Sequence, residues 1–278
     1  MTRDRRTWRA NHRVAHASLA NEVKQLPLVA GEIRRIICPI ADLTTEQGDR
    51  DRQLCFGQAF TVLEVHEGRA FGFAERDGYV GYLDANALGP ATTPTHRVRA
   101  RLTQLYAQPD IKSRDLMTLS CGSLVSLIGQ QGRWGITADG HYIPMPHVES
   151  ADDPEPDPVA VAERLIGTPY LWGGNSAFGI DCSGLVQFSH LSAGIACPGD
   201  SDQQERALGT DIAADAPTAR GDLFFWPGHV AVAVDAQTLI HANAFHMAVA
   251  LEDREQAIDR IRARGDGDVR TRRRLKRA

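Results

Sequence analysis

The segment from Gly167 to Gly184, Gly-Thr-Pro-Tyr-Leu-Trp-Gly-Gly-Asn-Ser-Ala-Phe-Gly-Ile-Asp-Cys-Ser-Gly, constrains the fold more than any other part of the chain. Its glycines predict a bend, and Asp181 followed by Cys-Ser-Gly-Leu-Val-Gln-Phe predicts a capped helix that begins at Cys182. The first turn of a helix has unpaired N–H groups and the positive end of the dipole, and both favour a thiolate. The segment therefore predicts a reactive cysteine, although a cysteine taken alone is more often a small buried hydrophobic residue.

Two histidines follow in a predicted hairpin. His229-Val-Ala-Val-Ala-Val234 predicts a buried strand, Asp235-Ala-Gln237 a turn, and Thr238-Leu-Ile-His-Ala242 the returning strand. A turn about Asp235 or Ala236 places His229 opposite, or nearly opposite, His241 on one face of the sheet. One imidazole could then take the thiol proton while the other orients it, the logic of nucleophile, base and orienting residue.

At these positions the chain resembles the NlpC-type papain-like cysteine peptidases of bacteria, which cut cell-wall peptides. The resemblance implies that Cys182 is the nucleophile, His229 the base and His241 the third polar residue, and that Tyr170 contributes to the substrate or oxyanion site. The matching motifs occur in the family's order: Tyr170-x-Trp-Gly-Gly174, Asp181-Cys-Ser-Gly184, Arg220-Gly-Asp-Leu-Phe-Phe225, Gly228-His-Val-Ala231 and Leu239-Ile-His-Ala242.

The same resemblance implies further substrate contacts. Asp200 and Ser201 match an Asp-Ser pair that contacts substrate in recycling-type members, but polar residues are also expected on any exposed loop. Asp181 and Ser183 flank the nucleophile. Their side chains could cap the helix, bind the peptide, or do both.

The composition is that of an ordinary globular protein. The 278 residues, 42% of them hydrophobic, predict two or three modules. A net charge of −4 gives no indication of a nucleic-acid partner, and the basic segment from Arg270 to Arg277 is predicted to be a solvated end. Neither a membrane-spanning run nor the apolar part of a secretory signal is found, so we expect a cytoplasmic protein without a membrane partner. The five cysteines lack metal-type spacing and are expected to be reduced thiols.

The N-terminal half predicts small β modules. Residues 1–28 predict either a loose arm or a short amphipathic helix, and residues 29–92 predict a first β domain of short alternating strands. Residues 93–148 repeat that order after about 60 residues, which predicts a second copy of one module. The pattern resembles tandem bacterial SH3-like domains, which in this family precede the catalytic domain. The alternative is a β-rich region without a ligand role. The predicted strands are Ile33–Cys38, Phe60–Val65, Ala70–Ala74, Tyr79–Leu83, Leu124–Ile128, Arg133–Thr137 and Gly140–Pro144.

The C-terminal half predicts the catalytic domain. Residues 149–157 are acidic and interrupted by prolines, which predicts a linker, and residues 158–278 form the peptidase domain. Its predicted helices begin at Pro158, Cys182 and Arg254. The predicted fold class is therefore α+β: a papain-like catalytic domain, with helices packed on an antiparallel sheet, preceded by two small SH3-like β-barrels.

The resemblance implies hydrolysis of the bond between γ-D-glutamate and a diamino acid in murein peptides. Two SH3-like modules without an export signal resemble dipeptidyl-peptidase VI enzymes, which act on peptides with a free N-terminal L-alanine, so a role in peptide recycling is expected. In such relatives a tyrosine and a glutamate of the first module face the amine. Tyr79 matches the tyrosine, and Gln58 stands where the family usually has glutamate.

Three other functions stay open. An amidase or an acyltransferase could use the same Cys-His-His site, and a noncatalytic wall-binding protein could rely on the β modules. A zinc site made by Cys182, His229 and His241 is the metal alternative, but the paired close-spaced ligands of structural zinc are absent. We expect neither a metal nor a cofactor.

Overall fold

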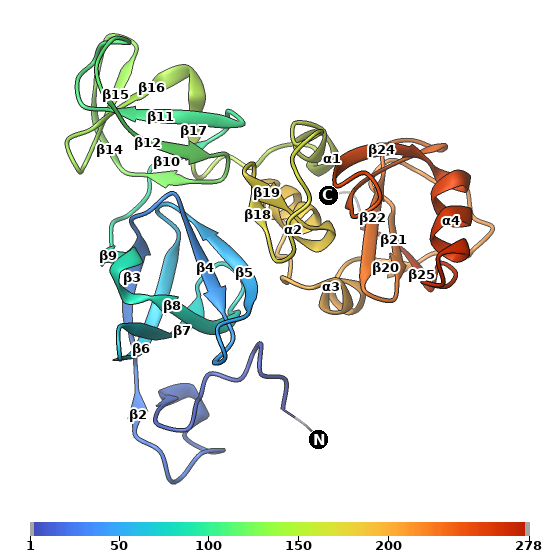
Figure 1. The fold of residues 1–278 in the computed structure, drawn as a ribbon, viewed down its shortest axis with the longest axis horizontal. Coiled ribbons are helices and arrows are strands. Elements are labelled where there is room, and N and C mark those ends of the chain that lie inside the picture. Colours follow the sequence, from blue (N-terminus) through green and yellow to red (C-terminus); the bar gives the residue numbers. More distant parts are fainter. Residues whose placement is uncertain (1–2, 276–278) are drawn as a thin grey trace. The chain divides into compact units, whose positions relative to one another are not determined.

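The structure, a computed structural model, describes residues 3–275 and divides into two compact units, Met1–Asp153 and Pro154–Ala278 (Figure 1). The boundary lies in the acidic segment 149–157, whose first two residues end a strand. Met1, Thr2 and the predicted tail residue Arg277 lie outside the described residues.

The first half of unit 1 is a sheet of seven strands in the order β5-β4-β8-β7-β6-β3-β9. Its core contains Ile36, Leu54 and Phe60, which are fully buried. The alternating segments predict β3, β6, β7 and β8 to within two residues, whereas β4 and β5 were not predicted. The strands are β3 (Glu32–Ile36), β4 (Ile40–Thr44), β5 (Arg50–Cys55), β6 (Ala59–His66), β7 (Arg69–Ala74), β8 (Val80–Asp84) and β9 (Leu88–Pro90), with a 3₁₀ turn η2 (Ala85–Ala87).

The second half of unit 1 repeats this strand order. One sheet has the order β12-β11-β16-β15-β14 and the other the order β13-β10-β17. If β13 and β14 together correspond to β6, each strand has a counterpart with the same neighbours in the first half. The elements are β10 (His96–Val98), β11 (Leu102–Tyr106), β12 (Asp115–Ser120), β13 (Leu124–Val125), β14 (Leu127–Gln131), β15 (Trp134–Thr137), β16 (Tyr142–Pro144), η3 (Met145–His147) and β17 (Val148–Ser150).

The two halves of unit 1 are packed against each other. Phe56, from the first half, is buried in the core of the second, and its carbonyl oxygen accepts from the N–H of Leu124 at 2.8 Å. Gly57 has a φ of +78°, and a Cβ there would collide with the carbonyl of Leu124. This contact explains why the halves behave as one compact unit.

The N-terminal arm is neither a loose segment nor an α-helix over residues 3–28. Its short strands β1 (Ala15–His16) and β2 (Leu28–Val29) pair in parallel and flank a 3₁₀ turn, η1 (Ala17–Leu19). Val14 packs with Leu63 and Phe71 of the first sheet, and Arg13 Nε donates to Glu64 at 2.8 Å. Apolar packing and an ion pair therefore fix the arm on β6.

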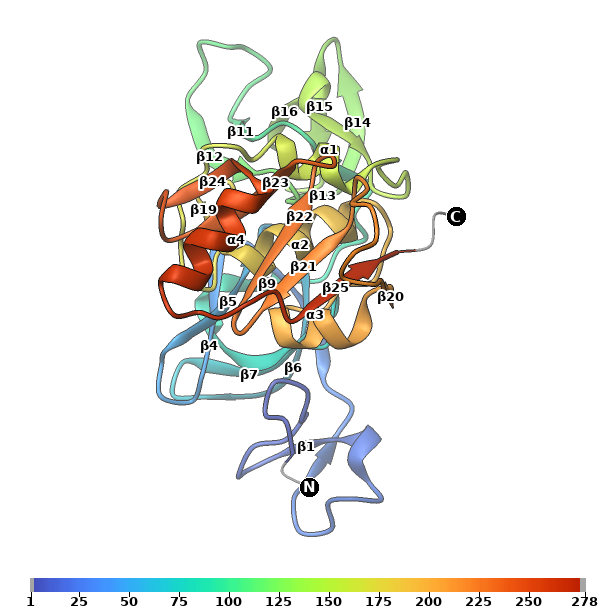
Figure 2. The ribbon, with the colours of Figure 1, turned by 90° about the vertical axis from the view of Figure 1, so that its right-hand side faces the viewer.

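Unit 2 is built on a six-stranded antiparallel sheet in the order β20-β25-β21-β22-β23-β24 (Figure 2). Ala231, Ala233 and Leu239 pack with α4 on one face of the sheet. Helix α2 packs against β22 and β23 on the opposite face. The elements are α1 (Pro158–Glu163), β18 (Asn175–Ser176), β19 (Gly179–Ile180), α2 (Cys182–Ser192), α3 (Ser201–Ala207), β20 (Thr210–Asp211), β21 (Leu223–Trp226), β22 (His229–Ala233), β23 (Thr238–Asn243), β24 (Ala248–Asp253), α4 (Arg254–Ala263) and β25 (Thr271–Arg274).

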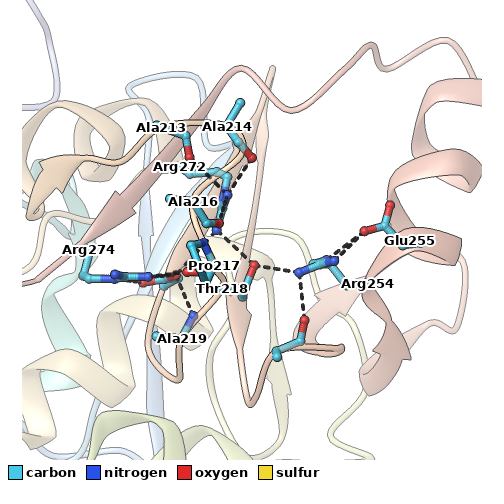
Figure 3. A network of polar contacts seen from close by, with 12 residues as sticks. Ala213, Ala214, Ala216, Pro217, Thr218, Ala219, Arg254, Glu255, Arg272 and Arg274 are labelled. Carbon is cyan, nitrogen blue, oxygen red and sulfur yellow. Dashed lines mark hydrogen bonds and ion pairs between the residues drawn. The ribbon is translucent and has the colours of Figure 1, made fainter.

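The basic C-terminal segment is part of the sheet through Arg274, so its prediction as a solvated end is wrong for those residues. Arg272 is 9% exposed and donates to the carbonyls of Ala214 and Ala216, each at 2.9 Å (Figure 3). Arg274 donates to the buried carboxylate of Asp222 at 2.6 Å. The arginines thus satisfy loop carbonyls and a buried charge, as a folded strand can and a solvated tail cannot.

Candidate active site

Cys182 is the first residue of α2, so the predicted helix start is confirmed, and the helix runs to Ser192. Asp181 has extended backbone angles and accepts from the N–H of Gly184 at 2.6 Å, so the predicted N-cap is also confirmed. Its other oxygen accepts from the N–H of Gly173 at 2.9 Å. The buried carboxylate of Asp181 therefore fixes both the helix start and the glycine bend before it. Cys182 is 7% exposed.

The glycines of the two motifs have a steric reason. A Cβ at Gly184 would collide with the carbonyl oxygen of Gly174, and a Cβ at Gly174 would collide with the carbonyl of Gly179. The Gly-Gly bend crosses the first turn of α2 at backbone contact distance, which only glycine permits. Glycine is therefore required at positions 174 and 184 for the bend to pack against α2.

Replacing Asp181 by alanine is expected to lower the free energy of unfolding of unit 2 by about 3 kcal/mol, because a cap is lost and the buried N–H of Gly173 is left unpaired. The matched control is Asp253→Ala, which removes the exposed cap of α4 and is expected to cost about 1 kcal/mol. Urea unfolding of both variants measures the difference. Equal losses would contradict the dual role of Asp181.

The second part of the site comes from the hairpin that contains both histidines. Pro227-Gly228 is a two-residue turn with Gly228 at a φ of +72°, and it places His229 at the start of β22. The thiol of Cys182 lies 3.9 Å from the carbonyl oxygen of Gly228, the residue before His229. His229 Nε2 lies 2.9 Å from His241 Nδ1, so the prediction that the two imidazoles meet is confirmed.

The register explains this contact. Val232 pairs with Ile240, and the same register places Ala231 across from His241. His229 is therefore the diagonal neighbour of His241 on one face of the sheet. The ring of His229 also packs on Trp226, with centroids 5.7 Å apart.

Glu252 extends the pair of histidines and was not predicted from the sequence. Its Oε2 lies 3.0 Å from His241 Nε2, and Arg260 of α4 donates to it from Nε to Oε1 at 2.8 Å and from Nη2 to Oε2 at 2.7 Å. The site therefore contains a connected series of four side chains: His229, His241, Glu252 and Arg260.

The environment shifts the pKa of three of these groups. Burial, with a smaller contribution from the nearby His241, lowers the pKa of His229 to about 3. Burial also lowers the pKa of His241, against the opposing effect of Glu252, while Arg260 and His246 add to the lowering. Burial raises the pKa of Glu252, but hydrogen bonds from Arg260 and His241 outweigh it and lower the value to about 2. In the absence of a thiolate, two neutral imidazoles and a carboxylate are thus the stable set at neutral pH.

Tyr170, Asp200 and Ser201, which are predicted to bind substrate, lie in the segments that flank α2 in the sequence. Tyr170 is half-buried and forms a β-bridge with Ile180, two residues before Cys182. Asp200 and Ser201 begin α3, and the fully buried Gln204 of α3 donates to the carbonyl of Ser183 at 2.8 Å. Gln204 thus connects α3 to the first turn of α2, and sequence reasoning missed this role.

The predicted residues of unit 1 are enclosed within their own module. Tyr79 is 4% exposed and belongs to the first core. The side-chain oxygen of Gln58 accepts from the N–H of Cys55 at 3.0 Å and from Arg76 Nη1 at 2.9 Å. Both lone pairs of that oxygen are therefore engaged within the module.

Among residues 3–275, no group of three His, Cys, Asp or Glu side chains has an arrangement that could hold a metal ion. No helix there combines the length and apolar character needed to cross a bilayer.

Comparison with known proteins gives the family. A model described as "NlpC/P60 family" matches residues 167–260, and one described as "Bacterial dipeptidyl-peptidase Sh3 domain" matches residues 44–88, within the first half of unit 1. The chain is 34% identical over 282 residues to a gamma-D-glutamyl-L-lysine dipeptidyl-peptidase of Bacillus cereus, across 90% of this chain and 74% of the relative. It is 26% identical over 215 residues to dipeptidyl-peptidase 6 of Lysinibacillus sphaericus, across 69% and 79% of the two chains.

A solved structure supports the fold. The crystal structure of an NlpC/P60 family protein from Bacillus cereus is similar with a TM-score of 0.72 and 19% identity, and the match covers 88% of this chain and 99% of the other. This likeness confirms the predicted papain-like fold. Because the 34% identical relative also aligns over most of both chains, the protein belongs to the NlpC/P60 family and is a cysteine peptidase.

Proposed function

We propose that the protein hydrolyses the bond between γ-D-glutamate and the diamino acid of murein peptides that carry a free N-terminal L-alanine. The observation that carries the proposal is the thiol at the start of α2 beside the Pro227-Gly228 turn that leads into His229, with His241 behind His229. Two relatives that align with 69% and 90% of this chain are named as dipeptidyl-peptidases, and the name of one specifies a gamma-D-glutamyl-L-lysine bond. A dipeptidyl-peptidase releases a dipeptide from the N-terminus of its substrate, and this name supports the free amine in the proposal.

In the proposed mechanism, Cys182 Sγ attacks the γ-carbonyl carbon of D-glutamate. His229 takes the thiol proton and then gives it to the amine of the departing diamino acid, which leaves an acyl-enzyme. The backbone N–H at the start of α2 and Tyr170 stabilise the oxyanion. A water molecule activated by His229 then hydrolyses the thioester, and Cys182 is regenerated.

The ring nitrogen available to the thiol follows from the geometry. Nε2 of His229 is engaged with His241, so Nδ1 is the nitrogen that exchanges the proton. His241 acts through His229 by holding its ring, and Asp181 acts through the position of Cys182.

We further propose that the second half of unit 1 is another SH3-like module, because its strand order repeats that of the half matched by the dipeptidyl-peptidase Sh3 model. The prediction that Tyr79 and Gln58 read the substrate amine is kept as part of this proposal. Gln58→Glu tests it, because a carboxylate offers a second oxygen while the first keeps Cys55 and Arg76. The nearby Arg76 weakens the effect of the added charge on the substrate.

Incubation with L-Ala-γ-D-Glu-L-Lys is expected to release L-Ala-γ-D-Glu and lysine, identified by mass, and the meso-diaminopimelate peptide is assayed beside it. N-acetylation of the alanine is expected to lower kcat/KM by about tenfold, which corresponds to about 1.4 kcal/mol for one hydrogen bond to a charged amine. Gln58→Glu is expected to increase this preference several-fold, and Tyr79→Phe to leave the fold intact and reduce it.

Each alternative has a distinct outcome in this assay. Transfer of the dipeptide to an added amine would indicate an acyltransferase, and cleavage of a different amide would indicate an amidase. Binding of murein fragments without turnover would indicate a wall-binding protein. Equal kcat/KM for the free and the acetylated peptide in the wild type, Gln58→Glu and Tyr79→Phe would contradict amine recognition by the first module.

The peptide-recycling role and the cytoplasmic location remain predictions. Fractionation of cells that produce the tagged full-length chain tests the location. Accumulation of the intact tripeptide after deletion of the gene tests the role.

A further inference from the structure

Glu252 of β24 lies diagonally across from His241, and its carboxylate contacts the ring nitrogen that does not face His229. His241 pairs with Ala250 and Leu239 pairs with Glu252, so Glu252 is the diagonal neighbour of His241 on the same face. The Glu252 side chain is 10% exposed, and that of Arg260 is 18% exposed. This diagonal is the same type of contact that joins His229 to His241.

The hydrogen-bond partners determine where the protons are. The ionised carboxylate of Glu252 can only accept, so His241 Nε2 carries the hydrogen and donates to it. In neutral His241 the Nδ1 atom then has the lone pair, so His229 Nε2 donates to it. Neutral His229 consequently has its lone pair on Nδ1, the nitrogen assigned to the thiol proton.

We infer that Glu252, held by Arg260, is a positioning residue that fixes the tautomers of His241 and His229 so that the base lone pair is on Nδ1 of His229. The inference assigns a role for the reaction, and to that extent it rests on the proposed function. Glu252 touches neither substrate nor thiol and acts only through the two histidines.

Without Glu252 the hydrogen on each histidine ring can move to the other ring nitrogen. His241 would be equally able to carry its hydrogen on Nδ1, and a donor there would oblige His229 to accept at Nε2. Neutral His229 would then carry its hydrogen on Nδ1 and offer no lone pair to the thiol. A wrong tautomer of the catalytic histidine lowers kcat by about 10⁴ in the serine-protease triad, whereas loss of an outer partner of a metal-bound histidine costs about 10- to 100-fold. We expect kcat to fall by about 10²- to 10³-fold in Glu252→Leu.

Two variants separate the acceptor from the charge. Glu252→Leu removes both. Glu252→Gln keeps one side-chain oxygen, which can accept hydrogen bonds from both His241 and Arg260 Nη2. Its NH₂ group then faces Arg260 Nε, so two donors meet and one hydrogen bond is lost. We therefore expect Glu252→Gln to keep the tautomers and to lower kcat by about tenfold or less.

The control is Glu205→Leu. Glu205 is a side chain of the same unit with the same 10% exposure and an arginine partner, Arg270, but no histidine partner among the described residues. We expect it to lower the free energy of unfolding as Glu252→Leu does and to leave the tautomers unchanged.

The direct readout needs no substrate. In a Cys182→Ala background His229 cannot pair with a thiolate, and long-range ¹H–¹⁵N spectra of the histidine rings report which nitrogen carries the hydrogen. His229→Gln and His241→Gln variants assign the signals. We expect Nε2–H on both histidines when Glu252 is intact and in Glu252→Gln, and a substantial Nδ1–H population on both in Glu252→Leu.

A second readout is the pH profile of iodoacetamide alkylation of Cys182 in the chain with the thiol intact. We expect its midpoint to rise by at least one pH unit in Glu252→Leu and to stay within about half a unit in Glu205→Leu and Glu252→Gln. If Glu252 served only to stabilise the fold, Glu252→Leu and Glu205→Leu would give the same pH profile once the rates are corrected for the fraction of folded protein.

The inference is overturned if Glu252→Leu keeps the Nε2–H tautomers, or if Glu252→Gln is as impaired as Glu252→Leu. Failure of the proposed function gives a different result, because the wild-type protein would then leave the tripeptide intact while its tautomers and alkylation profile still depended on Glu252.

Discussion

Replacement of Cys182 by alanine is expected to lower kcat on L-Ala-γ-D-Glu-L-Lys by about 10⁴-fold or more and to leave folding intact. Removing a nucleophile abolishes the covalent route, and only substrate binding and oxyanion stabilisation remain. The side chain is small and forms no disulfide, so alanine leaves little empty volume. His229→Gln is expected to be nearly as severe, and His241→Gln equal or milder because it acts through His229.

The same prediction extends to the reactivity of the thiol. Brief treatment with iodoacetamide at pH 6 is expected to modify Cys182 far faster than the other four cysteines. Burial raises the pKa of Cys55 to about 12 and raises that of the half-buried Cys38, whereas the helix start and His229 favour the thiolate at Cys182. Peptide mapping by mass spectrometry measures the five rates.

Circular dichroism of Cys182→Ala is the control for folding. Turnover retained by Cys182→Ala would contradict the mechanism, and equal labelling of all five cysteines would contradict an activated thiolate. Loss of turnover together with loss of the folded spectrum would instead indicate a packing role for the residue.

The features that could be predicted from sequence are those that neighbouring residues determine. Asp181 caps the helix that starts at the next residue, so the cap and the helix start at Cys182 follow from four consecutive positions. The meeting of His229 and His241 follows from one short hairpin, because the two predicted turns, about Asp235 or Ala236, differ by two residues of register and both leave the rings on one face.

The features that were missed depend on contacts between distant residues or on buried charges. Glu252 has no motif, and its contact with His241 arises from the β23–β24 register. Strand β5 begins Arg-Asp-Arg-Gln, and its Arg52 is buried, so no apolar alternation marks it. Strand β25 consists of Thr271 and three arginines, and the partners of Arg272 and Arg274 lie in the segment before β21, 52 to 59 residues earlier. Hydrophobic periodicity carries no signal when the buried face is charged.

The second large effect expected is a loss of stability in acid caused by His190. This residue of α2 is 1% exposed, its Nδ1 donates to the carbonyl of Val186 at 2.8 Å, and its Nε2 has no hydrogen-bond partner among the described residues. Burial lowers the pKa of His190 to about 4, against the smaller opposing effect of that hydrogen bond. The folded protein therefore keeps His190 neutral at pH values where the unfolded chain binds a proton.

The direction of the effect follows from this difference in proton binding. Above pH 6.5, the ordinary histidine value, His190 is neutral in both states and the stability does not depend on it. Between pH 6.5 and about 4 the unfolded state gains a proton that the folded state does not, so the free energy of unfolding falls as the pH is lowered. The difference between 6.5 and about 4 corresponds to about 3 kcal/mol, and below pH 4 this contribution changes no further.

His190→Leu is expected to remove this part of the acid sensitivity. It loses one hydrogen bond at every pH, so its stability at pH 7 is lower, but its decrease between pH 7 and pH 4 is expected to be smaller than that of the wild type by about 3 kcal/mol. His229 and His241 also have lowered pKa values and act in the same direction in both proteins, so the comparison isolates His190. The control His246→Leu removes an exposed imidazole of the same unit and is expected to keep nearly the wild-type decrease, because His246 is the smallest of the causes that lower the pKa of His241. Pulse proteolysis in urea, read from peptides of α2, measures unit 2 alone. Parallel curves for wild type and His190→Leu would show that His190 is protonated in the folded state and that its burial does not oppose the charge.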